Sequence, residues 1–166
     1  MAETTLGGNP AKTSGELPAV GSAAPMFELT GIDLKPVSSS EMEGRRLVLN
    51  IFPSLDTAVC ATSVRRFNEL AAGLDNTIVL NVSADLPFAQ KRFCGAEGIE
   101  NVTLGSVFRN PEFGDDYGVR LTESRMAGLL ARAVVVLDTD GTVLHSQLVP
   151  SIGSEPDYDA AIASLG

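Results

Sequence analysis

The sequence is poor in the residues from which metal sites and imidazole-based catalytic triads are built. Its 166 residues include one histidine and two cysteines, and tryptophan is absent. The cysteines, Cys60 and Cys94, lie far apart and do not form a Cys-x-x-Cys motif, which excludes a zinc ribbon and a closely spaced redox dithiol. We therefore expect no metal and no other cofactor.

Long hydrophobic runs and an excess of positive charge are also missing. No stretch approaches about 18 apolar residues, so no membrane span is expected, and residues 1–6 lack the basic and apolar parts of a signal peptide. The net charge of −9, from 12 basic and 21 acidic residues, argues against a nucleic-acid partner, which needs a basic face. We therefore expect a cytoplasmic protein.

The composition that remains is that of an ordinary globular protein, with 44% apolar and 20% charged residues. A chain of this length buries roughly two thirds of its unfolded surface. No repeat or low-complexity tract divides it, so we expect one domain over residues 1–166.

Strand and helix patterns alternate along the chain and predict an α/β fold with a central mixed β-sheet flanked by helices and an N-terminal β-hairpin. The predicted elements are a hairpin within 1–25, a short strand at 27–30, a helical turn near 38–42, strands at 47–52 and 77–83, a helix from Cys60 to near Gly73, a helix capped by Asp85 and ended by Gly95, a short helix at 111–117, strands at 133–137 and 142–148, and a last helix capped by Ser154 and running through Ser164.

Cys60 lies where a predicted strand ends and a predicted helix begins. Pro53 has no N–H and ends the strand, and Asp56 and Thr57 are residue types that cap helices. The first N–H groups of a helix lack internal partners and the helix dipole is positive there, which favours the nucleophilic thiolate. This position predicts a reactive cysteine, with Thr57 able to turn toward its sulfur. The alternative is an inert buried thiol, the commoner role of a free cysteine.

Three sequence blocks resemble a known family. Residues 53–60 have the pattern Pro-x-x-x-Thr-x-x-Cys, which is the active-site signature of peroxiredoxins, and the longer stretch 52–68 resembles their thiol peroxidase branch. Residues 83–95, which end in Arg-Phe-Cys-Gly, are similar to the resolving-cysteine segment of that branch. Residues 128–136, which contain Ala-Arg-Ala-Val-Val-Val, resemble the segment that carries the family's catalytic arginine. The resemblance runs from about residue 8 to the C-terminus.

This resemblance implies a thioredoxin-like fold and an enzyme that reduces hydrogen peroxide and alkyl hydroperoxides to water and alcohols. It implies that Cys60 is the peroxidatic nucleophile, that Thr57 orients the sulfur and the peroxide, and that Pro53 shields the sulfur from water. Arg132 would supply a planar guanidinium whose donors can serve two atoms at once. The implied partners are the hydroperoxide substrate, thioredoxin as reductant, and a second copy of the chain in a homodimer.

Cys94 is then expected to resolve the Cys60 sulfenic acid by forming a disulfide with it. A disulfide needs Cα atoms within about 4.4–6.8 Å, so two cysteines on separate helices would require both helix ends to unwind. Gly95 and Gly98 make local melting beside Cys94 easier. The alternative is a preformed structural disulfide, which is rarer in a reducing compartment.

Two other functions use the same residues. A sensing module would be oxidised at Cys60 and read by a partner, and a structural domain would carry inert thiols. His145 is expected to lie on a face of the sheet rather than to act as a base, since a thiolate mechanism does not need it. Arg65 and Arg66 are expected to be solvated on their helix and lie outside the predicted site.

Overall fold

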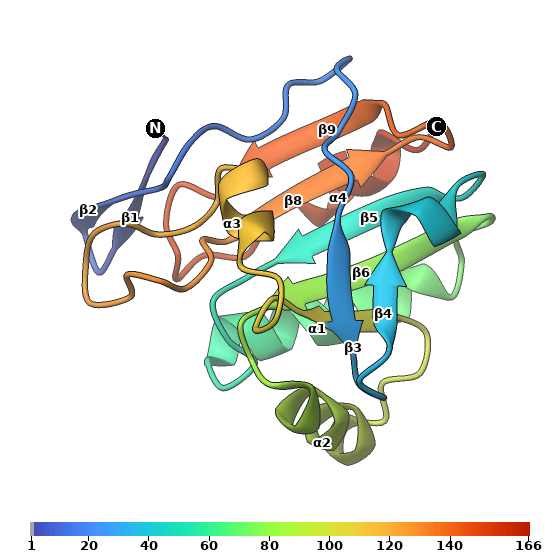
Figure 1. Cartoon of the computed structure of the whole chain (residues 1–166), viewed down its shortest axis with the longest axis horizontal. Helices are drawn as coiled ribbons and strands as arrows, with labels where there is room; N and C mark the ends of the chain where they lie inside the picture. The colour runs from blue at the N-terminus through green and yellow to red at the C-terminus, as the bar shows by residue number, and fades with distance from the viewer. Residues whose placement is uncertain (1) are drawn as a thin grey trace.

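Strands and helices alternate through the chain and build one twisted mixed sheet with helices on both of its faces, beside a small separate hairpin (Figure 1). The computed structural model describes residues 2–166. Its elements are β1 (Glu3–Leu6), β2 (Asn9–Lys12), β3 (Glu28–Gly31), β4 (Pro36–Ser38), the 3₁₀-helix η1 (Ser39–Met42), β5 (Arg46–Ile51), α1 (Ala58–Ala71), β6 (Thr77–Ser83), α2 (Pro87–Glu97), β7 (Thr103–Ser106), α3 (Glu112–Asp116), β8 (Ala133–Leu137), β9 (Val143–Leu148) and α4 (Tyr158–Ala163).

The large sheet has seven strands in the order β4-β3-β7-β6-β5-β8-β9. Its three central neighbours β7, β6 and β5 run parallel, and the outer strands pair antiparallel. Strands β1 and β2 form the N-terminal hairpin. The predicted α/β class, with a mixed central sheet and an N-terminal hairpin, is confirmed.

Alternate residues of the central strands pack on opposite faces of the sheet, as the strand period of two requires. Leu49 of β5 belongs to a cluster with Phe27 and Phe113, on the face that holds α3 (Figure 1). Its neighbour Val48 packs instead with Phe67 of α1, on the opposite face. Helix α1 therefore lies against the sheet beside β5 and β6, and its first turn begins near the ends of those strands.

The parallel pairing of β5 and β6 brings two loops to one edge of the sheet. Ile51 lies opposite Val82, so both strands end at the same edge. The loop 52–57 leaves β5 there and enters α1, and residues 84–86 leave β6 there and enter α2. The two cysteine-bearing helices thus begin close to one another at this edge.

The second long helix extends further than the sequence predicted. Gly95 was expected to end it, but α2 continues to Glu97 and Gly98 is its C-cap residue. Gly98 has φ +65° and its N–H donates to the carbonyl of Cys94, the left-handed cap for which glycine is the usual residue. Gly95 lies within the helix, and Cys94 remains in the last turn.

Two predicted helix caps were also wrong. Leu86 rather than Asp85 is the N-cap residue of α2, with Pro87 in the first turn, because the Asp85 carboxylate accepts hydrogen bonds from other segments. Helix α4 is capped by the Asp157 carboxylate, which accepts from the Ala160 N–H, rather than by Ser154. Asp157 directly precedes Tyr158, the first residue of the helix, so it lies closer than Ser154 to the N–H groups that need a cap.

Strands β4 and β7 were not predicted, because they are short and partly polar. Strand β7 pairs with β3 at Gly105, where a Cβ atom would lie 2.8 Å from Leu29 Cδ1. The absence of a side chain at Gly105 leaves room for Leu29 of β3 to pack there. No helix within residues 2–166 combines the length and the apolar character needed to cross a membrane.

Candidate active site

Cys60 lies in the first turn of α1 and is fully buried. Thr57 is the N-cap residue, with the extended backbone typical of that position, and its side chain makes no capping hydrogen bond. The sulfur therefore belongs to the end of the helix where the dipole is positive, as the sequence predicted.

Arg132 brings a guanidinium group to this sulfur from a distant part of the chain. It directly precedes β8, whose first residue Ala133 pairs with Ile51 at the end of β5. Its Nη2 donates a hydrogen bond to the Cys60 Sγ at 3.0 Å, and its Nε donates to the Ile152 carbonyl at 2.8 Å. The residue is only 1% exposed, and its buried Nη1 has no partner within residues 2–166.

Thr57 and Pro53 lie on the loop that precedes Cys60. The Thr57 hydroxyl donates to the Ser54 carbonyl at 3.0 Å, and within the described chain it makes no hydrogen bond to the sulfur. Its hydrogen is thus engaged while its oxygen stays available as an acceptor. Pro53 is buried beside the same helix start.

A cavity of about 180 Å³ opens beside these groups. Pro53, Thr57 and Arg132 line it together with Ile152. The rest of the lining is almost entirely apolar and consists of Leu6, Ala58, Val59, Met126 and Gly153. The site therefore combines one guanidinium and one hydroxyl with an apolar mouth.

Cys94 is half-buried in the last turn of α2, and both cysteines are free thiols. It packs against the apolar cluster in which Cys60 is buried, together with Phe93 of its own helix and Leu55 of the Cys60 loop. Burial raises the pKa of the Cys94 thiol above its ordinary value, so this thiol is protonated at neutral pH.

Comparison with known proteins assigns the chain to a family. The redoxin family model matches residues 19–162. This chain belongs to the redoxin family. The thiol peroxidase of Mycobacterium tuberculosis (strain H37Rv) is 61% identical over 166 residues, which cover 100% of this chain and 99% of that protein. The thiol peroxidase of Corynebacterium glutamicum is 59% identical and covers 99% of both chains.

Solved structures agree with this assignment. A peroxiredoxin-like protein from Aquifex aeolicus superposes with a TM-score of 0.94 at 41% identity, covering 99% of this redoxin and 96% of that chain. A thiol peroxidase from Chromobacterium violaceum, at 20% identity, has the same fold with a TM-score of 0.91 and covers 98% and 94%. The resemblance to the thiol peroxidase branch of the peroxiredoxins and its thioredoxin-like fold are thereby confirmed.

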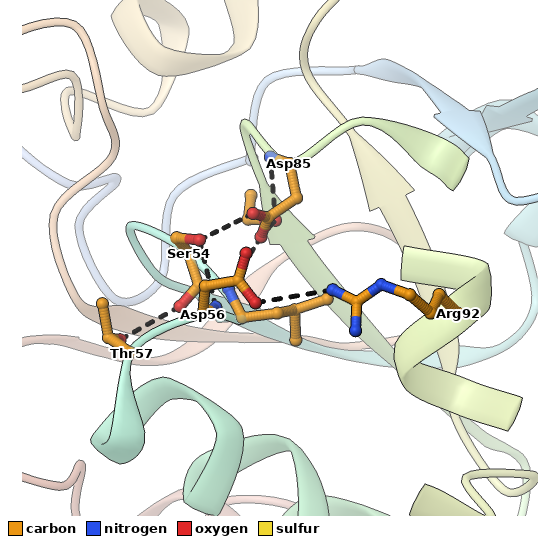
Figure 2. A network of polar contacts seen from close by, with 7 residues as sticks. Ser54, Asp56, Thr57, Asp85 and Arg92 are labelled. Atoms are coloured by element: carbon orange, nitrogen blue, oxygen red, sulfur yellow. Dashed lines mark hydrogen bonds and ion pairs between the residues drawn. The ribbon is translucent and has the colours of Figure 1, made fainter. Parts of the chain in front are cut away.

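Asp85 contributes to the redoxin site in a way that the sequence did not reveal. Its carboxylate accepts hydrogen bonds from the Ser54 hydroxyl at 2.7 Å, the Leu55 N–H at 2.8 Å and the Ser83 hydroxyl at 2.7 Å (Figure 2). The sequence carried one usable signal: Asp85 follows a buried parallel strand, and the carboxyl ends of neighbouring parallel strands meet at one sheet edge.

The remaining charged and titratable candidates lie outside the redoxin site. Arg65 and Arg66 pair with Glu97 and Glu69 at the surface, as their predicted exposure suggested. His145 lies in the edge strand β9, and its buried Nε2 has no partner within residues 2–166. Across the same residues, no three His, Cys, Asp or Glu side chains gather in an arrangement that could hold a metal ion.

Proposed function

We propose that this redoxin is a thiol-dependent peroxidase that reduces hydrogen peroxide and alkyl hydroperoxides to water and alcohols in antioxidant defence, with Cys60 as its nucleophile. The observation that carries the proposal is the hydrogen bond of 3.0 Å from the buried Arg132 guanidinium to the Cys60 sulfur. A permanently charged donor at this distance stabilises negative charge on the sulfur. The thiol peroxidases to which the chain is 59–61% identical support the same reaction class.

In the first step, the Cys60 thiolate attacks one oxygen of the hydroperoxide. A sulfur–oxygen bond forms while the oxygen–oxygen bond breaks, so the sulfur is oxidised by two electrons and the peroxide is reduced. The leaving alkoxide or hydroxide takes a proton from solvent. Negative charge moves from the sulfur to the leaving oxygen during this step. The buried Nη1 of Arg132 has no partner in the described chain, so it is available to donate a hydrogen bond to that oxygen. The Thr57 oxygen accepts the hydroperoxide O–H.

The apolar mouth of the cavity supports alkyl hydroperoxides as substrates besides hydrogen peroxide. Leu6, Met126 and Ile152 line the approach to Thr57 and Arg132. An alkyl group placed there is removed from water, which contributes about 25 cal/mol for each Å² of apolar surface buried. Hydrogen peroxide gains nothing from this lining.

In the second step, the Cys94 thiol attacks the Cys60 sulfenic acid. A disulfide forms, and the hydroxyl leaves as water with the Cys94 proton. A dithiol reductant then opens the disulfide and is itself oxidised, and the sequence resemblance makes thioredoxin the proposed donor. Since each cysteine is part of a helix, the proposed disulfide requires local unwinding at both helix ends.

The experiment is steady-state peroxide consumption with a thioredoxin system, using hydrogen peroxide and a bulky organic hydroperoxide as substrates. The expected result is sustained turnover with both, and no turnover for Cys60→Ser. A serine hydroxyl is scarcely ionised at neutral pH and cannot form a sulfenic acid. Consumption that stops after one equivalent would favour the sensing module instead.

A homodimer is also part of the proposal and rests on the family resemblance. Static light scattering at high micromolar concentration measures the association state directly. A mass equal to one chain at that concentration would contradict the dimer.

A further inference from the structure

The Asp85 carboxylate ties together the two segments that carry the cysteines. Two of its three hydrogen-bond donors, the Ser54 hydroxyl and the Leu55 N–H, belong to the loop that leads to Cys60 (Figure 2). Asp85 itself stands directly before the N-cap of α2, the helix that carries Cys94. One side chain thus joins the start of the resolving helix to the peroxidatic loop.

The Asp85 side of this contact is firmly anchored. The Asp85 carbonyl accepts a hydrogen bond from the Ser106 hydroxyl at 2.6 Å. Ser83, the third donor to the carboxylate, also accepts from the Gln90 side chain at 3.3 Å, and Gln90 is fully buried in α2. The loop around Ser54 is therefore held by groups fixed to β6, β7 and α2.

On the Cys60 loop, Ser54 connects Asp85 to the candidate catalytic residue Thr57. The Ser54 carbonyl accepts hydrogen bonds from the Thr57 hydroxyl at 3.0 Å and from the Thr57 N–H at 3.2 Å. The position of Ser54 therefore sets the position of the Thr57 oxygen beside the cavity. Within residues 2–166, Asp85 makes no hydrogen bond to the sulfur and does not line the cavity, so it acts on both through Ser54 and Leu55.

We propose that Asp85 is a positioning residue, a carboxylate latch that holds the Cys60 loop in the peroxide-reactive arrangement and must release it before Cys94 reaches Cys60. This role rests on the proposed peroxidase function. Hydrogen bonds to an ionised carboxylate are stronger than those between neutral groups, so the latch favours the folded loop. The same bonds oppose the unwinding that the disulfide needs. Asp85 therefore speeds the reaction with peroxide and slows the resolution step.

The test compares Asp85→Ala with Asp56→Ala, which removes a carboxylate from the loop itself. The Asp56 side chain is 74% exposed, and within residues 2–166 its one ion pair is with Arg92 at 3.5 Å, so it is a matched control for the loss of charge (Figure 2). In rapid-mixing experiments, Asp85→Ala is expected to lower the second-order rate with peroxide by roughly 10-fold or more, because displaced catalytic groups lose rate steeply. Its first-order rate of disulfide formation is expected to rise. Asp56→Ala is expected to change neither rate.

Asp85→Asn provides a graded variant, because its amide keeps one acceptor oxygen. Its two rates are expected to lie between those of the wild type and Asp85→Ala, and it replaces Asp85→Ala if that variant does not fold. A merely structural Asp85 would lower both rates together with the unfolding temperature. That result, or two unchanged rates, would overturn the latch.

Amide hydrogen exchange in the reduced protein separates this proposal from the proposed function. The Leu55 and Thr57 amides are expected to exchange faster in Asp85→Ala than in Asp56→Ala, with the amides of β6 unchanged. If the wild type does not consume peroxide, the proposed function fails, and this exchange still decides whether Asp85 controls the loop. Equal exchange in the two variants would overturn the latch even in an active enzyme.

Discussion

The buried guanidinium group of Arg132 needs a negatively charged partner to offset the cost of its desolvation. The group is 1% exposed, and no ion pair within the described chain involves it. A buried charge without a counter-charge is costly. Its hydrogen-bond acceptors are a backbone carbonyl and the Cys60 sulfur, and of these only the sulfur can carry a full negative charge. The thiolate that the proposed peroxidase mechanism requires at Cys60 would supply this counter-charge.

Arg132→Lys is expected to lower the second-order rate with peroxide by roughly 10²–10³-fold, although the charge is kept. Lysine cannot donate to Cys60, to Ile152 and to the substrate with one planar group. Stopped-flow oxidation of the reduced protein measures this rate. Arg65→Lys, on the exposed face of α1, is the control and is expected to leave it unchanged. An unaltered rate in Arg132→Lys would remove Arg132 from the reaction.

Cys94→Ser is expected to leave the first oxidation intact and to block recycling by thioredoxin. Cys60 then stalls as a sulfenic acid and is overoxidised by excess peroxide. Intact-mass analysis after successive equivalents of peroxide follows this course. Full thioredoxin-linked turnover by Cys94→Ser would deny Cys94 its resolving role. A disulfide found in the wild type before any peroxide is added would indicate a structural bridge.

Among the secondary-structure elements, the start of α1 is held by a series of buried polar side chains that links it to β5 and β6. Asn81 of β6 accepts from the Asn50 amide at 2.8 Å, the Asn50 amide also donates to the Ser63 hydroxyl at 3.2 Å, and Ser63 donates to the Cys60 carbonyl at 2.8 Å. Asn50 and Asn81 occupy paired positions of the parallel strands β5 and β6. This series of side chains connects the helix turn that carries Cys60 to the centre of the sheet.

Ser63→Ala is expected to lower the free energy of unfolding by about 1–2 kcal/mol, because it leaves buried polar groups of Asn50 and Cys60 short of a partner. Denaturant unfolding measures the change. Thr62→Ala is the control, since the exposed Thr62 hydroxyl makes a similar bond to the Ala58 carbonyl at 2.9 Å where water can replace it. Equal effects of the two substitutions would contradict the structural role of this series of side chains.

His145, in the edge strand β9, is expected to make the free energy of unfolding depend on pH. Burial lowers the pKa of this histidine below its ordinary value of 6.5, against a smaller opposing effect of Asp157. The unfolded chain then binds the proton more readily than the folded one, so stability is present above about pH 6.5 and is lost as the pH falls below it. Between pH 7 and pH 5, His145→Gln is expected to lose less stability than the wild type. Identical losses in thermal unfolding would contradict this assignment.

The elements could be predicted where they depend on local sequence, and not where they depend on tertiary contacts. Apolar runs correctly located β5, β6 and β8, because buried strands need little else. Asp85 is a residue type that commonly caps helices, yet its carboxylate accepts hydrogen bonds from Ser54 and Leu55, far away in the sequence. The short strand β7 is specified by its neighbour Leu29, which packs over Gly105. No local pattern contains such information.

In the molecule as a whole, the candidate site is assembled from segments that only the complete sheet brings together. The family motif indicated Pro53 and Thr57 on one loop with Cys60 at the start of the helix that follows, and the block around Arg132 was recognised by resemblance. The apolar mouth of the cavity was not predicted, because Leu6 comes from the N-terminal hairpin and Ile152 from the segment after β9. The N-terminal hairpin reaches this place because β1 forms a bridge to Ser151.

The central claim is that Cys60 is the group that peroxide oxidises, and one measurement tests it most directly. Reduced Cys94→Ser is mixed with one equivalent of hydrogen peroxide in the presence of a sulfenic-acid trapping reagent, and the modified residue is located by peptide mass analysis. The account predicts one adduct on Cys60, formed at the rate at which peroxide disappears, and none when Cys60→Ser is added to the same chain. Peroxide consumption without modification of Cys60, or at the same rate in the double variant, would contradict it.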